Sequence, residues 1–141
     1  MVGIKRYVDV NVFIYWLGKH PSLGETAYKW IKDIEGAPPG EYVISALTLY
    51  EVLVIIAGLS GKSLRDEKVA EGAVKAVTSL RGLALEDLKA EDYIKALSLM
   101  KRYDLDFEDA LHTSIALRLG LKEAISNDKD LDRTPLRRIF S

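Results

Sequence analysis

Short β-branched segments alternate with longer amphipathic segments along this chain, and that alternation constrains the fold more than any other feature of the sequence. It predicts strands at residues 6–10, 42–44, 83–85 and 124–126, and helices at residues 12–17, 22–35, 46–57, 63–80, 90–103 and 107–119. Strands that alternate with helices build a parallel sheet covered on both faces, and sites in such sheets form at the carboxyl ends of the strands. We therefore expect an α/β fold. The charged tail from Lys129 to Ser141 has no clear assignment.

Size and charge limit the classes of protein to consider. The 141 residues, 48% apolar and 29% charged, predict one domain spanning residues 1–141. A net charge of −1 gives no overall attraction for polyanions, so a nucleic-acid site would have to be local. The longest apolar run, Val52 to Leu59, is far shorter than the roughly 20 residues of a membrane span, so we expect no membrane contact. Without cysteine or a secretion signal, a cytoplasmic protein fits best.

Amide side chains are scarce in this sequence. Glutamine is absent and the only asparagines are Asn11 and Asn127, a composition typical of proteins from thermophile hosts. Asn11 follows Asp9 by two residues, and Asn127 directly precedes Asp128. The amides that remain therefore lie at the same places as two of the acids considered next.

Two carboxylates stand in apolar surroundings. Asp9 is the only charged residue between Tyr7 and Gly18, and it falls where a buried parallel strand would end. Glu51 lies in the middle of the 46–57 helix, which is apolar enough that we expect it to be largely buried. An ionised group there must be paired or bind a cation. The structural alternatives are that Asp9 only caps a helix and that Glu51 forms a buried salt bridge to a distant Lys or Arg.

Two further carboxylates follow near the end of the chain. Asp109 lies in the first turn of the 107–119 helix, which Asp106 can cap, so stabilisation of the helix dipole could explain it. Asp128 directly follows a short strand, as Asp9 does, and is therefore expected at the same edge of the sheet. The adjacent Asp130 and Asp132 are interpreted as a solvated run.

A pocket holding Asp9, Glu51, Asp109 and Asp128 would need cations, because four carboxylates repel one another and raise each other's pKa values. Mg²⁺ or Mn²⁺ suits such hard oxygen ligands. A zinc site is disfavoured, since the chain has no cysteine and only two histidines. Of these, His112 is expected to pack against the fold or to hydrogen-bond Asp109 rather than to ligate metal.

Four motifs in order give the chain a family resemblance. They are Tyr7-Val8-Asp9-Val10-Asn11, Ser45 with Tyr50-Glu51-Val52, Asp109-Ala110-Leu111-His112, and Ile125-Ser126-Asn127-Asp128. With these motifs the chain resembles PIN-domain ribonucleases and, within them, the VapC-like toxins of toxin–antitoxin pairs. The resemblance implies a three-layer α/β/α sandwich with a central parallel sheet of four to five strands. Ser126 stands where such proteins often have Thr, and Leu131 replaces a common aromatic residue.

The resemblance also implies a chemistry. Asp9 and Asp109 would hold the first Mg²⁺ or Mn²⁺, with Glu51 and Asp128 completing the pocket directly or through water. The metal would supply hydroxide and stabilise charge on the phosphate, leaving a 3′-hydroxyl and a 5′-phosphate on RNA. Asn11 and Ser126 would orient acids or water.

The resemblance implies partners as well as a reaction. These are an RNA substrate, a small antitoxin protein of a type II pair, and a second copy of the chain. A homodimer would cover apolar surface expected at Trp16, Tyr28 and Trp30. The 63–80 helix matches no motif, and its role stays open.

Other functions fit parts of the same sequence. A housekeeping RNA-processing nuclease would share every motif with a toxin. A signalling receiver domain also has an acidic Mg²⁺ pocket, but its phosphoacceptor should end a middle strand, whereas residues 83–85 lead only to Glu86 and Asp87. A haloacid-dehalogenase-type phosphatase would need a second Asp in place of Asn11. A PIN-like binding protein without catalysis would usually have lost one of the four acids.

Overall fold

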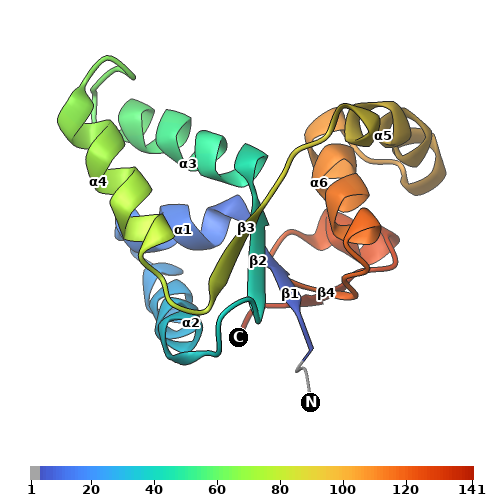
Figure 1. Ribbon diagram of the computed structural model, residues 1–141, viewed down its shortest axis with the longest axis horizontal. Coiled ribbons are helices and arrows are strands. Elements are labelled where there is room, and N and C mark those ends of the chain that lie inside the picture. Colours follow the sequence, from blue (N-terminus) through green and yellow to red (C-terminus); the bar gives the residue numbers. More distant parts are fainter. Residues whose placement is uncertain (1–3) are drawn as a thin grey trace.

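The computed structural model describes residues 4–141 and is built around a parallel sheet of five strands (Figure 1). The strands lie in the order β3-β2-β1-β4-β5, and every neighbouring pair is parallel. Their bounds are β1 Arg6–Val8, β2 Tyr42–Ser45, β3 Leu83–Glu86, β4 Glu123–Ile125 and β5 Arg137–Ile139. The first and fourth strands are neighbours, so the residues that follow β1 and β4 emerge side by side.

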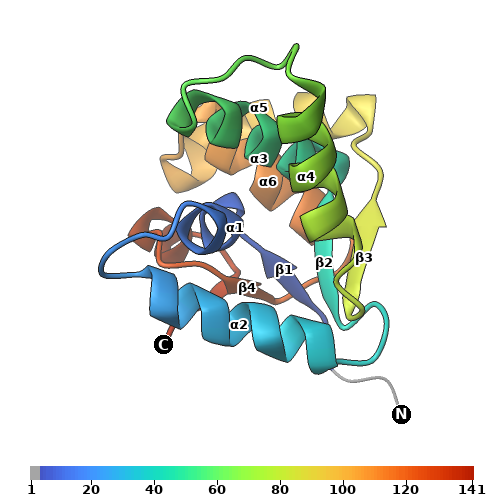
Figure 2. The ribbon, with the colours of Figure 1, turned by 90° about the vertical axis from the view of Figure 1, so that its left-hand side faces the viewer.

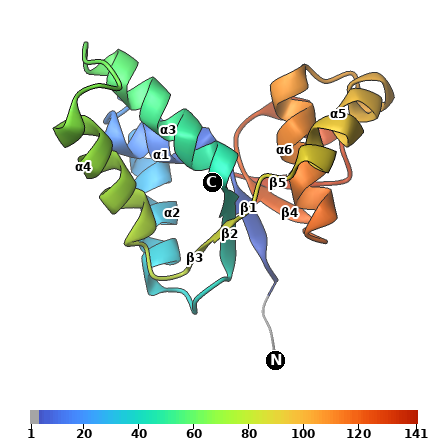
Figure 3. The same cartoon turned by 45° about the horizontal axis from the view of Figure 1, so that its top comes forward.

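Helices cover both faces of this sheet, which confirms the expected three-layer sandwich (Figures 1 and 3). One layer holds α1 Val10–Leu17, α2 Gly24–Gly36, α3 Ala46–Leu59 and α4 Glu67–Thr78. The other holds α5 Ala90–Tyr103, α6 Phe107–Arg118 and the 3₁₀ helix η1 Lys129–Arg133. In Figure 3 the two helical layers diverge upward from the sheet, with α3 and α6 on opposite sides of it.

Two apolar cores follow from the alternation of side chains along the strands. On β1, Val8 packs into the core beneath α1 to α4, whereas Tyr7 packs into the core beneath α5 and α6. On β4, Ile125 and Ala124 divide in the same way. The phenol of Tyr7 therefore lies on the face of the sheet that carries α6.

Several boundaries differ from the sequence prediction. Helix α4 begins at Glu67 rather than near Ser63, because Asp66 caps it by accepting hydrogen bonds from the backbone N–H groups of Lys68 and Val69. Helix α2, which runs along the bottom of Figure 2, begins at Gly24 without a side-chain cap. Ser22, the expected cap, does not cap the helix. Instead, Nδ1 of His20 accepts hydrogen bonds from the backbone N–H groups of Ser22 and Leu23, just before the helix begins. The unassigned tail forms η1 and the edge strand β5.

Helix α3 is less buried than its composition predicts. Only Thr48, Val52 and Ala57 are fully buried, whereas Tyr50 is 57% exposed and Leu59 is 66% exposed. One face of α3 packs on the core and the opposite face meets solvent, so the expectation of a largely buried helix is wrong. Among residues 4–141, no helix combines the length and apolarity that crossing a membrane requires.

Candidate metal centre

Asp9 and Asp128 lie at the carboxyl ends of adjacent strands, where the sequence predicts them. Asp9 follows β1 and caps α1, accepting a long hydrogen bond of 3.5 Å from the backbone N–H of Asn11. Ser126 follows β4, and its hydroxyl donates to Asp9 Oδ2 over 2.6 Å. The same hydroxyl oxygen accepts the backbone N–H of Asp128 over 3.0 Å. Ser126 therefore joins the Asp9 carboxylate to the backbone of Asp128 by hydrogen bonds.

Asp109 approaches from the opposite side, in the first turn of α6. Asp106 caps this helix as predicted, because its Oδ1 accepts the backbone N–H of Asp109 over 2.8 Å. The cap is thus supplied by Asp106. Asp109 is not the cap, although its place in the first turn still favours the helix dipole, and its carboxylate lines the pocket.

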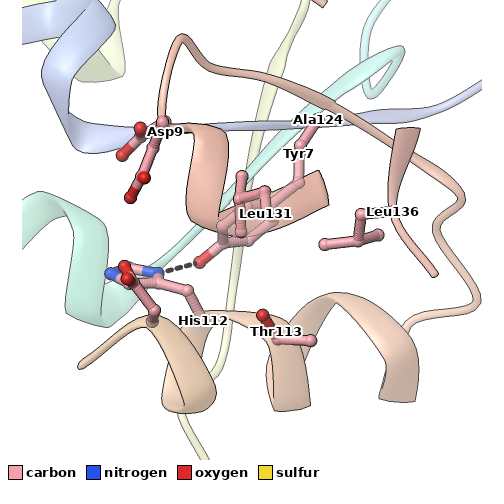
Figure 4. A pocket seen from close by; sticks show the side chains of 9 residues that line it. Tyr7, Asp9, His112, Thr113, Ala124, Leu131 and Leu136 are labelled. Atoms are coloured by element: carbon pink, nitrogen blue, oxygen red, sulfur yellow. Dashed lines mark hydrogen bonds between the residues drawn. The ribbon is translucent and has the colours of Figure 1, made fainter. Parts of the chain in front are cut away.

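One pocket brings these three acids together (Figure 4). Asp9, Asp109 and Asp128 line it with His112, and its other lining residues are Tyr7, Thr113, Ala124, Leu131 and Leu136. Its volume of about 20 Å³ is enough to hold about one water molecule. Sequence segments about a hundred residues apart therefore converge on a small acidic space.

Glu51 lies beside this pocket rather than among its lining residues. Its Oε1 accepts a hydrogen bond of 2.5 Å from Nε2 of His112, which does line the pocket. Nδ1 of the same ring bonds the Tyr7 hydroxyl over 2.6 Å, shown as the dashed line in Figure 4. This contact differs from both alternatives drawn from the sequence. Glu51 bonds His112 rather than a distant Lys or Arg, and His112 bonds Glu51 rather than Asp109.

Two more carboxylates, which the sequence analysis did not assign to the site, lie close to these acids. Glu108, one turn before His112 on α6, has a carboxylate within 4.8 Å of ligand atoms of Glu51 and His112. Asp130 stands in the same relation to Asp109 and Asp128, but its side chain is exposed and pairs with Arg133 at 3.1 Å, as a solvated run predicts. Helical spacing from His112 could have indicated Glu108. Asp132 likewise pairs with an arginine, Arg138, at 3.0 Å.

The acids raise one another's pKa values. Burial, together with the charges of Asp128 and Asp106, raises the pKa of Asp109 to about 6. Burial and the nearby Glu51 raise the pKa of Glu108 to about 7. Burial also raises the pKa of Asp9, although the Ser126 hydrogen bond partly offsets this.

The pKa of His112 is raised as well, which for this residue favours the charged form. Burial lowers its pKa, but the contacts with Tyr7 and Glu51 outweigh burial and raise it to about 10. The imidazolium form donates from both nitrogens. Crowded carboxylates with raised pKa values and hard oxygen donors are the chemistry that fits a divalent cation such as Mg²⁺ or Mn²⁺.

The structure also bears on the role expected of Asn11 and on the receiver-domain alternative. Asn11 meets Asp9 through its backbone N–H rather than through its side-chain amide. The amide oxygen of Asn127 instead accepts from the hydroxyl of Tyr15 over 3.2 Å. Strand β3 lies at the sheet edge, and the pocket is lined by neither Glu86 nor Asp87. This arrangement does not match a receiver domain, whose phosphoacceptor should end a middle strand.

Comparisons with known proteins agree with this architecture. The PIN domain model matches residues 6–136. VapC20 of Mycobacterium tuberculosis, a sarcin-ricin-loop-cleaving toxin, is similar in structure with a TM-score of 0.77 and 16% identity, over 97% of this chain and 100% of that one. VapBC2 of Rickettsia felis, bound to promoter DNA, gives a TM-score of 0.65 and 17% identity, over 98% and 100% of the two chains.

A chain from a toxin–antitoxin complex shows the same fold. This complex, from Klebsiella pneumoniae, gives a TM-score of 0.62 and 19% identity, over 94% of this chain and 99% of that one. No curated protein matches the sequence. Because the family model spans nearly the whole chain, including the strands and helices that carry the acidic pocket, the chain belongs to the PIN domain family.

Proposed function

We propose that this protein is an Mg²⁺- or Mn²⁺-dependent endoribonuclease that acts as the toxin of a type II toxin–antitoxin pair. The observation that carries the proposal is the pocket shared by Asp9, Asp109 and Asp128, in which crowding raises the pKa of Asp109 to about 6. Membership of the PIN domain family supports nuclease chemistry at that pocket.

Asp9 and Asp109 are the first metal ligands in this proposal, and Glu51 and Asp128 complete the set directly or through water. A divalent ion bound there would supply Lewis-acid chemistry, activating water and stabilising charge on the scissile phosphate. Ser126 keeps the Asp9 carboxylate in place by donating to Oδ2. The two strands and α6 fix the acids before any substrate arrives, which favours preorganised stabilisation of developing charge.

Single-stranded or looped RNA is the proposed substrate, because sequence-specific recognition of RNA generally requires splayed bases. VapC20 is a toxin, and the similar Klebsiella pneumoniae chain belongs to a toxin–antitoxin complex, which supports a small antitoxin as the partner of this chain. A homodimer and a cytoplasmic location belong to the same proposal. Of the residues expected to drive dimerisation, Tyr28 is 51% exposed, whereas Trp16 and Trp30 are partly buried and pack against the core.

An RNA-cleavage assay tests the proposal. Purified protein is incubated with end-labelled single-stranded and hairpin RNA in Mg²⁺ or Mn²⁺, and parallel samples contain EDTA. Cleavage should require the metal and leave a 3′-hydroxyl and a 5′-phosphate. Asp9→Asn keeps the shape of the side chain while removing its charge, so it should abolish cleavage in a protein that remains folded.

Asp33→Asn is the matched control, because it makes the same chemical change at an exposed position on α2, away from the pocket. It should cleave as the wild type does. Wild-type rates from Asp9→Asn, or cleavage that persists in EDTA, would show that the acidic pocket is not the nuclease site.

A further inference from the structure

His112 occupies a central place that the proposed reaction does not by itself explain. It lines the acidic pocket with Asp9 and Asp109, yet it bonds Glu51, which lies outside the lining. Both ring nitrogens are engaged, Nε2 by Glu51 over 2.5 Å and Nδ1 by Tyr7 over 2.6 Å. The side chains of His112 and Glu51 are only 13% and 14% exposed. A metal could bind this ring only by displacing one of the two partners.

The Tyr7 end of this contact is anchored by the sheet. The Tyr7 hydroxyl also bonds Ser45 Oγ over 3.0 Å and Thr48 Oγ1 over 3.2 Å. Ser45 ends β2 and forms a capping box with Thr48 in the first turn of α3. All three side chains are buried. The ring of His112 is therefore held at one nitrogen by a group fixed to β1, β2 and the start of α3.

Every group in this chain of contacts has a consistent role. The Glu51 carboxylate can only accept, so Nε2–H of His112 donates to Glu51 Oε1. The Tyr7 hydroxyl can both donate and accept, so it can satisfy Nδ1 of His112, Ser45 Oγ and Thr48 Oγ1 in either charge state of the ring. Buried networks in which every member is satisfied hold side chains in one geometry. Glu51 is thereby left with Oε2 as the oxygen not committed to His112.

We propose that His112 is the positioning residue for Glu51: anchored on Tyr7, it bridges α6 to α3 and fixes the Glu51 carboxylate beside the three-acid pocket. This inference rests on the proposed metal-dependent function. The contribution of Glu51 to the metal site then depends on its hydrogen bond to His112, and the ring of His112 is a hydrogen-bonding partner rather than a metal ligand. Partners that orient ligating carboxylates typically affect metal affinity or activity about 10–100-fold when removed.

A double-mutant cycle on cleavage rate and Mn²⁺ affinity tests this role. His112→Leu removes both hydrogen bonds, and Glu51→Gln removes the carboxylate that His112 is proposed to position. In the wild-type background His112→Leu should lower kcat or Mn²⁺ affinity by about 10–100-fold. In the Glu51→Gln background it should cause less than about a threefold further loss, because residues that act through one another are not additive. Equal losses in both backgrounds would overturn the proposal.

Two further variants keep the test informative if His112→Leu folds poorly. Tyr7→Phe removes only the anchoring hydroxyl, and it should lower kcat in the wild-type background but not in Glu51→Gln. His112→Gln retains an amide that can donate to Glu51, so it should be faster than His112→Leu. Ser114→Ala is the control on α6, because Ser114 is buried outside the acidic pocket and its hydroxyl has no hydrogen-bond partner among the described residues. Equal rates for the Leu and Gln variants would contradict positioning through a donated hydrogen bond.

Nitrogen NMR of metal-free protein labelled at its two histidines gives a readout that needs no activity. His112 should show a slowly exchanging ring N–H whose signal moves in Glu51→Gln, while His20 should not change. A freely exchanging His112 N–H would overturn the proposal. If the wild type cleaves no RNA, the proposed function fails, but coupling in Mn²⁺ affinity together with this NMR signature would still support the positioning role.

Discussion

Asp109→Asn should make the metal-free protein more stable, although it removes a charge that is proposed to be functional. Burial and neighbouring acids raise the pKa of Asp109 from its usual 3.8 to about 6. At 1.36 kcal/mol per pKa unit, that rise corresponds to about 3 kcal/mol against the ionised form. Because the side chain is only half-buried, solvent screening reduces the penalty to about 1–2 kcal/mol. Losing the favourable contact with the helix dipole removes about 0.5 kcal/mol of the gain.

The sign of the pH dependence follows from the raised pKa. The folded protein holds the Asp109 proton more tightly than the unfolded chain does, so the unfolding free energy falls as the pH rises from 3.8 to about 6. Above that range the whole penalty is present. Asp109→Asn should therefore gain about 1 kcal/mol at pH 7.5, or about 3 °C in Tm, and the gain should vanish near pH 4.

Urea unfolding in EDTA at pH 7.5 and at pH 4 measures this difference directly. Asp33→Asn, on the exposed face of α2, is the control and should change neither value. Saturating Mg²⁺ should reverse the order, because the wild type alone keeps the full set of acids. An Asp109→Asn protein that is less stable than the wild type at pH 7.5 in EDTA would refute the repulsion inferred among the acids of the pocket.

Three further predictions concern the fold and its assembly. Gly82→Ala should cost about 2–3 kcal/mol in urea unfolding, because a Cβ would lie 2.3 Å from the Ile34 carbonyl oxygen and 2.7 Å from Ala37 Cβ; an unchanged midpoint would contradict this packing. Arg118→Ala should lower the free energy of unfolding by about 3 kcal/mol above about pH 4, because the buried Asp92 carboxylate loses the ion pair that Arg118 forms with it at 2.7 Å. Although burial raises the pKa of Asp92, Arg118 lowers it overall, so the loss should fade as the pH falls through that lowered pKa; a pH-independent loss would contradict the ion pair. Light scattering should report a homodimer, and a concentration-independent mass near 15.8 kDa would rule it out.

Most of the sheet can be predicted from local sequence, because β-branched runs bounded by helical segments are readable without tertiary information. The strands predicted at residues 42–44 and 83–85 lie in β2 and β3. β5 could not be predicted, since Arg137 and Arg138 carry charge into a three-residue edge strand. Its pairing with β4 depends on the folded sheet rather than on its own composition.

Some features of the site can likewise be predicted from the sequence, and others cannot. Asp9 and Asp128 are predictable from position, because each follows a parallel strand and adjacent strands end at the same edge. The contact between Glu51 and His112 joins residues 61 apart, across two helices, and no local pattern encodes it. The apolar surroundings of Glu51 in the sequence indicate that it needs a partner, but they do not identify His112.

Calorimetric titration of metal-free protein with Mn²⁺ tests the central claim most directly, because it measures binding without requiring a known RNA. We predict saturable binding for the wild type and for Asp33→Asn, and binding weakened at least about tenfold for Asp9→Asn and Asp109→Asn, which each remove a proposed ligand. Equal Mn²⁺ affinity in all four proteins, or no saturable binding by the wild type, would contradict a divalent-metal centre in the pocket of Asp9, Asp109 and Asp128.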